Sequence, residues 1–339
     1  MRLAGLSAAL LLAGCTTTPV GLPPASVVAL GETEPVGTAN EDAADDPAIW
    51  RNAANPSQSL IVATDKKAGL YVYGLDGAVR SFLEVGQVNN VDLATLPDGT
   101  ILVAASDRND PATAHIVTAT LDPVTGELAL RRRFPVGAGE GYGFCMSVDA
   151  QGEFIHFYSP LKNGDIYLTT ASISAGLDAG TTSTMLHSLP SQPEGCVFDS
   201  RTDRLYVGEE VGGIWVLDFE TDERALVAPV DNRYLVADVE GLALAPEGDD
   251  GGYLVASSQG DNAYAVFALP DMTPVGRFAI AEGTFGSTQE TDGIDLKLGD
   301  FGPDYPHGLF VAQDGINSPN AQNFKLVSWS DVLDSLGLR

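Results

Sequence analysis

Short apolar runs separated by polar turns predict β-strands along most of the chain. An acidic pair opens the apolar run 45–50, a polar turn follows, and a second apolar run, 60–65, ends on charge. A third run, 69–73, closes at Leu75-Asp76-Gly77, a sequence typical of hairpin turns. The pattern predicts an antiparallel meander with its polar residues gathered at one edge.

This unit recurs about every 50 residues. Its first strand opens near six marker residues: Asp46, Asn90, Tyr142, Glu194, Glu240 and Asp292. The second strand recurs in the same phase and ends each time on polar or charged residues. Six such meanders predict an all-β fold, a six-bladed β-propeller, in which radial repetition protects the strand edges. The alternative is a β-sandwich with coincidental spacing, which the shared phase of both strands disfavours.

A single domain over residues 25–339 is expected, because no Ser/Gly-rich or Pro-rich linker interrupts the repeats. Helix signals are scarce. Only the tail, 330–336, suits a short helix, and Ser330 is the candidate N-cap.

Residues 1–14 carry the pattern of an export signal, with Arg2 followed by an apolar run too short to span a bilayer. Leu12-Ala13-Gly14-Cys15 resembles a bacterial lipobox, which implies cleavage before Cys15 and acylation of that residue. Residues 15–24 then form a tether. We expect an exported protein held at the periplasmic or outer-surface side of a bacterial membrane by lipid alone; an ordinary cleaved signal is the alternative.

Two cysteines remain in the expected propeller. The repeat aligns Cys196 with Phe144 and Cys145 with Val197. Alternation along a strand then sends the two thiols to opposite faces. An oxidising compartment permits a disulfide, but this alignment favours two buried free cysteines.

The charge balance, 18 basic against 46 acidic residues, excludes nucleic-acid binding through a basic patch. The acids concentrate at equivalent strand ends, which meet at one face of a propeller. The first-strand ends form a ring of Asp45, Asp46, Asn90, Tyr142, Glu194, Asp238, Glu240 and Asp292. The second-strand ends form a companion ring of Lys66, Arg108, Lys162, Glu210, Gln259 and Asp314.

These rings predict a metal-assisted site. Many carboxylates cannot stay ionised at close range without cations between them, and all-oxygen ligands suit Ca²⁺. Positively charged side chains beside bound calcium favour the binding of a multiply charged anion such as a phosphate ester. Four such side chains are expected near the acids: Lys66, Lys67, Arg108 and Lys162. No P-loop, Gly-x-Ser-x-Gly elbow or dinucleotide fingerprint is present, which favours hydrolysis without a covalent nucleophile.

The chain resembles the β-propeller phytases, the calcium-dependent alkaline phytases of bacteria, over nearly its whole length. The matching motifs include Asp45-Asp46-Pro47-Ala48-Ile49-Trp50, Asn89-Asn90-Val91-Asp92, Asp238-Val239-Glu240-Gly241-Leu242 and Thr291-Asp292-Gly293-Ile294-Asp295. The resemblance implies a six-bladed propeller that hydrolyses phytate, inositol hexakisphosphate, as its calcium complex. A monomer is expected.

The resemblance also implies roles for single residues. Calcium at the channel mouth would be held by Glu32, Asp45, Glu194, Asp238, Glu240, Gln259 and Asp292. Asp46, with backbone carbonyls, would hold a tighter structural ion. The phosphate-cleavage site matches Lys66, Arg108, Tyr142 and Glu210, and a neighbouring phosphate-gripping site matches Lys67 and Lys162. The implied mechanism is direct attack of a calcium-bound water on phosphorus, with Lys66 and Arg108 stabilising the developing charge. Glu210 would orient the water or serve the leaving oxygen.

Four positions depart from the family pattern. Asp65 and Asp107 stand where the family has Asn, and Gly286 and Ile316 stand where it has acids. Because Gly286 and Ile316 replace two acids, we expect one structural calcium site of the family to be missing. Two other functions fit a calcium-bearing propeller: a calcium-dependent lactonase or esterase, and a non-enzymatic binding protein.

Overall fold

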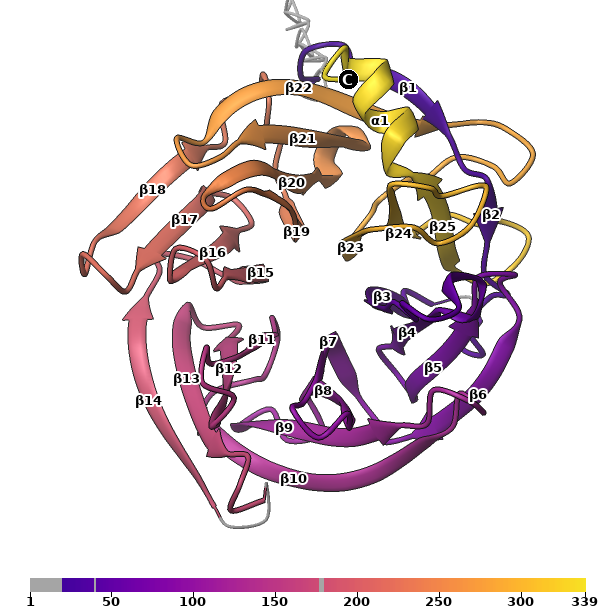
Figure 1. The fold of residues 1–339 in the computed structure, drawn as a ribbon. Helices are drawn as coiled ribbons and strands as arrows, with labels where there is room; N and C mark the ends of the chain where they lie inside the picture. The colour runs from indigo at the N-terminus through magenta and orange to yellow at the C-terminus, as the bar shows by residue number, and fades with distance from the viewer. Residues whose placement is uncertain (1–19, 40, 177–179) are drawn as a thin grey trace, which may run out of the picture.

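The computed structural model describes residues 20–39, 41–176 and 180–339. Six sheets surround a central channel, as Figure 1 shows, and the prediction of a six-bladed β-propeller is confirmed. Residues 1–19, which include the expected signal, Cys15 and most of the tether, lie outside the described part. Within the described ranges no helix is long and apolar enough to cross a membrane.

Each of the first four blades is a four-stranded antiparallel meander that runs in chain order from the channel outwards. Blade 1 contains β3 (Ala44–Trp50), β4 (Leu60–Asp65), β5 (Gly69–Gly74) and β6 (Val79–Glu84). Blade 2 contains β7 (Val88–Thr95), β8 (Ile101–Asp107), β9 (Thr113–Leu121) and β10 (Leu128–Ala138). Blade 3 contains β11 (Cys145–Val148), β12 (Phe154–Pro160), β13 (Asp165–Ser172) and β14 (Thr181–Ser188). Blade 4 contains β15 (Pro193–Asp199), β16 (Arg204–Glu209), β17 (Gly213–Asp218) and β18 (Arg224–Pro229).

The N-terminal strands close the ring (Figure 1). Blade 6 takes β23 (Ile294–Leu298), β24 (Gly308–Asp314) and β25 (Asn323–Ser328) from the end of the chain and β2 (Gly31–Glu32) from its start. Blade 5 contains β19 (Val239–Glu247), β20 (Gly251–Ser258), β21 (Ala263–Ala268) and β22 (Thr273–Ala281), and β1 (Ala25–Val28) joins it in parallel. Strands from near both ends of the described chain therefore pair within blades 5 and 6.

The hydrophobic cores lie between neighbouring blades. Second strands such as β4 and β24 are buried along their whole length, because a blade packs on each of their faces. Outer strands such as β6 alternate between part-buried and exposed residues. Between blades 1 and 2, for example, Val62 and Val72 pack with Val91 and Val103.

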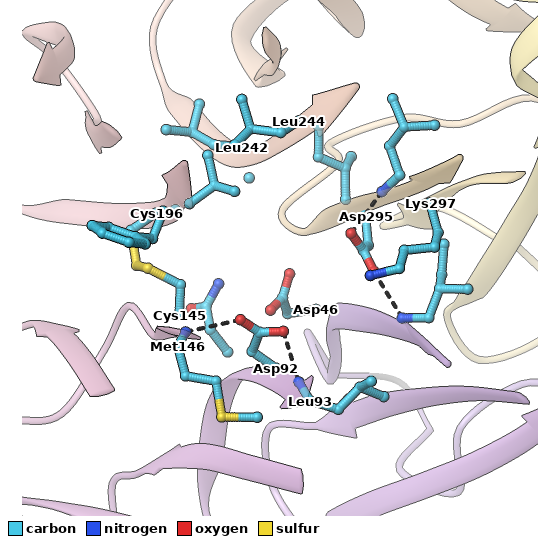
Figure 2. Close-up of a pocket in the computed structure, with 18 of the residues that line it drawn as sticks. Asp46, Asp92, Leu93, Cys145, Met146, Cys196, Leu242, Leu244, Asp295 and Lys297 are labelled. Atoms are coloured by element: carbon cyan, nitrogen blue, oxygen red, sulfur yellow. Dashed lines mark hydrogen bonds between the residues drawn. A yellow bond between two sulfur atoms is a disulfide. The ribbon is translucent and has the colours of Figure 1, made fainter. Parts of the chain in front are cut away.

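Three aspartates that face the channel join inner strands of neighbouring blades. In each, the Oδ2 atom accepts a hydrogen bond from a backbone N–H of the next blade: Asp46 from Val91 (2.9 Å), Asp92 from Met146 (2.8 Å) and Asp295 from Ile49 (2.7 Å). They line a channel cavity of about 430 Å³ (Figure 2). Burial raises the pKa of Asp92 to about 7. These carboxylates therefore serve the assembly of the ring.

Cys145 and Cys196 form a disulfide, with an S–S distance of 2.01 Å (Figure 2). The prediction of two free cysteines is wrong. The two cysteines do point to opposite faces of their own blades. Neighbouring blades pack face to face, so the face of blade 3 that carries Cys145 meets the opposite face of blade 4, which carries Cys196. Both cysteines belong to the single hydrophobic cluster between these two blades.

The predicted C-terminal helix is present as α1 (Trp329–Leu336), but its predicted N-cap is wrong. Ser328 is the N-cap, and its side chain accepts a hydrogen bond from the Asp331 N–H. Ser330 lies inside the helix and is buried. The helix begins earlier because Trp329, at its first position, packs into the core beside blades 5 and 6.

Candidate active site

The starts of inner strands lie beside the ends of second strands, as the repeat predicted. Ala44 pairs with Asp65 in blade 1, and Val88 pairs with Asp107 in blade 2. The residues that follow, Lys66 and Arg108, therefore lie at the same end of the channel as the first-strand acids.

A register shift occurs at the same place in the inner strands of four blades. It spans Ala44/Pro47, Val88/Val91, Pro193/Cys196 and Val239/Leu242. The two residues inside each irregularity are Asp45-Asp46, Asn89-Asn90, Glu194-Gly195 and Glu240-Gly241. Such bulges re-aim side chains next to active sites, and here three of them contain acids that the sequence singled out: Asp45, Asp46, Glu194 and Glu240.

Lys66 lies at the centre of one group of carboxylates. Its Nζ atom is 2.7 Å from Asp42 Oδ2, 3.2 Å from Asp45 Oδ2 and 2.7 Å from Asp292 Oδ2. Burial alone would lower the pKa of Lys66, but the three carboxylates outweigh burial and raise it. Gln259 donates from Nε2 to the other oxygen of Asp292 at 2.7 Å. Lys66 is therefore a fixed, buried positive charge.

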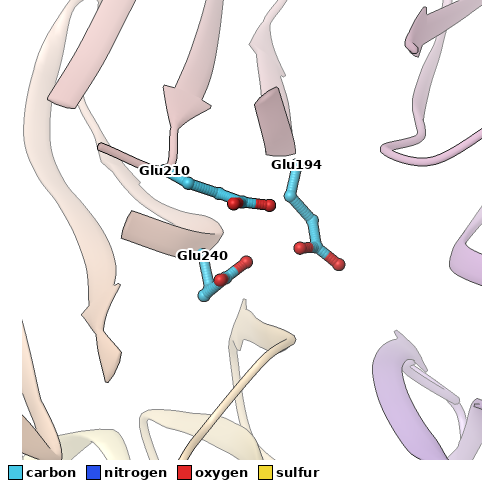
Figure 3. Close-up of side chains that lie close together, drawn as sticks. All are labelled: Glu194, Glu210 and Glu240. Carbon is cyan, nitrogen blue, oxygen red and sulfur yellow. The ribbon is translucent and has the colours of Figure 1, made fainter. Parts of the chain in front are cut away.

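Glu194, Glu210 and Glu240 form a second group, with one oxygen from each within 4.8 Å of the others (Figure 3). Burial raises the pKa of Glu194 to about 7. Burial, followed by the charge of Glu194, raises that of Glu240 well above its ordinary value. Burial also raises the pKa of Glu210, and the nearby charge of Asp238 adds to this effect.

Two of these buried acids have oxygens without a hydrogen-bond partner among the described residues. They are Glu240 Oε2 and both oxygens of Asp45, of which Oδ2 has only the ion pair with Lys66, and both side chains are almost wholly buried. Unpartnered carboxylate oxygens that repel one another are costly unless a cation neutralises them. An all-oxygen donor set of this kind fits Ca²⁺, so the residues present are suited to the predicted metal.

Two of the cations predicted to bind phosphate lie over one aromatic ring. The Cζ atom of Arg108 lies 4.9 Å from the Tyr142 ring centroid, and the Nζ atom of Lys162 lies 5.0 Å from it. Burial, followed by the charge of Glu194, raises the pKa of the Tyr142 hydroxyl, so the ring remains neutral. Glu210 accepts a short hydrogen bond from Gln192. The structure thus brings Arg108, Tyr142 and Lys162 together.

Three predicted residues lie away from these groups. Asp46 faces the channel cavity and bonds blade 2. Glu32 lies on β2, the outer strand of blade 6, and pairs with Lys325 at 2.5 Å. Lys67 is exposed. The metal roles of Glu32 and Asp46 and the substrate role of Lys67 stay predictions.

Three residues of the site were missed from the sequence. Asp42 pairs with Lys66, Glu140 pairs with Arg108 at 2.5 Å, and Asn89 bonds both Arg108 and Glu194. Asn89 lies within a matched family motif, which was a usable signal. Asp42 and Glu140 looked like ordinary loop acids, because nothing in the repeat assigned them a partner.

The two aspartates that depart from the family pattern shape the turns that carry the cations. Asp65 Oδ1 accepts from the Lys67 N–H at 3.1 Å. Asp107 Oδ1 accepts from the Asn109 N–H at 2.9 Å, and its Oδ2 atom lies 2.7 Å from Arg133 Nε. Asparagine can make the same turn, but it cannot pair ionically with Arg133.

Comparison with known proteins agrees with this geometry. A family model described as phytase matches residues 3–339. The chain is also 36% identical over 341 residues to the 3-phytase of Bacillus subtilis (strain 168), covering 92% of this chain and 85% of that protein. The chain belongs to the phytase family.

Proposed function

We propose that this protein hydrolyses phytate to phosphate and lower inositol phosphates, and that it requires bound calcium. One observation carries the proposal: buried acids with unpartnered oxygens lie beside the cations Lys66, Arg108 and Lys162. Family membership supports the substrate. A chain with a formal charge of −28 repels a free hexaphosphate, so the calcium complex of phytate is the fitting substrate.

Asp45, Glu194, Glu240 and Asp292 would hold the calcium ions, and Gln259 and Asp238 lie close enough in the site to contribute. The amide nitrogen of Gln259 is bonded to Asp292, so its carbonyl oxygen is the atom left for a ligand. Bound calcium supplies positive charge to the phosphate oxygens and Lewis acidity to the reacting groups.

The remaining chemistry belongs to side chains of this chain. Arg108 and Lys66 face the developing charge on the phosphoryl oxygens, the main contribution that a protein makes to phosphoryl transfer. Lys162 and the exposed Lys67 bind a second phosphate of the same ring. In the overall step, a water oxygen bonds to phosphorus, the bond from phosphorus to the inositol oxygen breaks, and that oxygen takes a proton.

Glu210 is suited to exchange that proton. Burial raises the pKa of its carboxyl group, and the bond from Gln192 fixes one of its oxygens. A carboxyl with a raised pKa holds a proton nearer to neutral pH than an exposed one does. It serves either the attacking water or the leaving oxygen.

Phosphate release from phytate, measured with calcium and with excess chelator, tests the proposal. We expect rapid release with calcium and almost none in chelator. Lactone and carboxylic-ester substrates, assayed in parallel, test the hydrolase alternative. Binding of phytate without phosphate release would support the binding-protein alternative, and full activity in chelator would refute the calcium requirement.

We further propose export, lipid attachment through Cys15 and a monomeric state. The lipobox-like sequence before Cys15 supports attachment.

A further inference from the structure

Asn89 lies between the two halves of the site. Its side chain is fully buried, within the irregularity of β7. Its Oδ1 atom accepts from Arg108 Nη1 at 2.5 Å, and its Nδ2 atom donates to Glu194 Oε1 at 2.7 Å. A third bond, from Nδ2 to Asn90 Oδ1 at 3.0 Å, leaves the amide no freedom to flip without losing contacts. One side chain thus joins the phosphate-site arginine to the acidic cluster.

Glu140 holds Arg108 from the other side. Its Oε1 atom accepts from Arg108 Nε at 2.9 Å and from Nη2 at 2.5 Å. Glu140 is part-exposed, and its bonds do not reach Glu194, Glu210 or Glu240 in the described structure. Both residues therefore orient the same guanidinium, but only Asn89 also contacts an acid of the cluster. This difference provides a matched pair for experiment.

We infer that Asn89 is a positioning residue that couples calcium binding at Glu194 to the orientation of Arg108. The inference rests on the proposed function, because it assigns Glu194 to a calcium ion. Hydrogen bonds behind a metal ligand fix its orientation, and their loss typically weakens metal binding or activity by about 10- to 100-fold. Coupling between two sites is reciprocal, but Glu140 reaches Glu194 only through Arg108 and Asn89, so its loss affects calcium binding less than the loss of Asn89 does.

The two variants then have different signatures. Asn89→Ala removes the donor to Glu194 and the acceptor for Arg108. It therefore weakens calcium binding by about 10- to 100-fold and lowers kcat/KM even at saturating calcium. Glu140→Gln loosens only Arg108, so it lowers kcat/KM while the calcium Kd stays within about threefold of that of the unaltered protein.

Calcium affinity is measured first without substrate, by titration calorimetry of metal-free full-length protein with calcium chloride. Phytate hydrolysis is then measured over a range of free calcium, with kcat and KM separated at saturation. Thermal unfolding in calcium excess confirms that each variant is folded. A purely structural role for Asn89 would lower the melting temperature and leave the calcium Kd of the folded protein unchanged.

Asn89→Asp guards against failure of the alanine variant to fold, since it keeps the shape and the acceptor for Arg108. Its second oxygen takes the place of the donor to Glu194, so this variant also loses the bond that orients that acid, and its calcium Kd departs from that of the unaltered protein. Weaker calcium binding in Asn89→Ala, or a changed calcium Kd in Asn89→Asp if the alanine variant does not fold, supports the inference when Glu140→Gln keeps the calcium Kd of the unaltered protein. Equal calcium affinities in all variants overturn it, as does an equal loss in Glu140→Gln. If the unaltered protein binds no calcium and keeps its activity in chelator, the proposed function fails instead.

Discussion

Replacing Lys66 by Met tests how the buried ion group serves both stability and catalysis. The substitution keeps the apolar stem but leaves Asp45 and Asp292 without their shared cation. The Lys66 side chain is only 10% exposed, and that of Asp45 is 1% exposed, so water compensates little. A position at an open, solvated rim would imply almost no effect on stability. Burial implies a substantial one.

The expected size follows from the geometry. Removing one partner of a buried ion pair costs about 3–5 kcal/mol, because a buried charge is left uncompensated. Unfolding entropy is about 2 cal/mol/K per residue, or about 0.7 kcal/mol/K for 339 residues. In chelator at pH 8 the melting temperature should therefore fall by about 4–7 °C. Calcium excess should restore part of this loss, because the ion neutralises the same carboxylates.

The assay is thermal unfolding in chelator and in calcium, together with kcat for phytate. Lys67→Met is the matched control, since Lys67 is the next residue, is exposed and has no ion pair within the described structure. We expect Lys66→Met to lower kcat by roughly tenfold to a thousandfold, the range for one lost charge-stabilising donor. The control should act mainly on KM. An unchanged melting temperature in chelator, or full activity of Lys66→Met, would refute the assigned role.

Three further predictions concern pH, the last blade and the N-terminus. Without calcium, the pKa of Glu194, raised to about 7 from 4.5, makes its contribution to stability greatest below pH 4.5 and lost as the pH rises through 7. Protons compete with calcium for the carboxylates, so the calcium Kd should rise as the pH falls below 7. Calorimetric titrations at about one-unit steps between pH 5 and 8 would measure this rise. At the last blade, Lys325 pairs with Glu32 and with Asp314 at 3.3 Å, so this group carries its own cation. Metal analysis after dialysis should show one more tight ion in Gly286→Asp/Ile316→Glu than in the unaltered protein. Finally, Cys15→Ser should abolish incorporation of labelled fatty acid in bacterial cells; equal labelling would exclude attachment at Cys15.

The fold could be predicted because its cause is periodic. Each blade repeats the same apolar strands and polar turns, so an error at one turn does not change the inferred architecture. The disulfide could not be predicted from the same periodicity. Pairing of Cys145 with Cys196 depends on how successive blades face one another, which strand alternation within a blade does not contain.

The site was predicted where side chains occur at repeated positions and missed where single loops supply partners. Lys66, Arg108 and Glu194 follow the repeat, and the structure brings them to one end of the channel. Asp42 and Glu140 lie on irregular segments before the strands, so their pairing with Lys66 and Arg108 depends on loop paths. Glu32 belongs to a matched motif, yet it lies at the outer edge of blade 6 because β2 closes the ring.

The acid-Gly pairs of the inner strands have one physical cause. A side chain at Gly195 would overlap the backbone carbonyl of Glu240, and one at Gly241 would overlap the backbone at Ile294. Neighbouring inner strands are therefore so close that only hydrogen fits at these positions. The Gly241 N–H donates to the Asp292 carbonyl at 2.8 Å across this narrow gap.

The same close approach creates the electrostatics of the site. Glutamates that precede glycines on adjacent inner strands, such as Glu194 and Glu240, are held close together, because each strand is hydrogen-bonded into its own blade and the two strands pack against each other. Their carboxylates are consequently held within a few ångströms of each other, with the pKa of each raised by burial. A cation held by these glutamates would relieve this repulsion without moving the backbone, and the preformed site would lose little conformational entropy on binding it. Ring closure by β2 would thus contribute to the proposed metal affinity as well as to stability, because an open ring would let the inner strands separate.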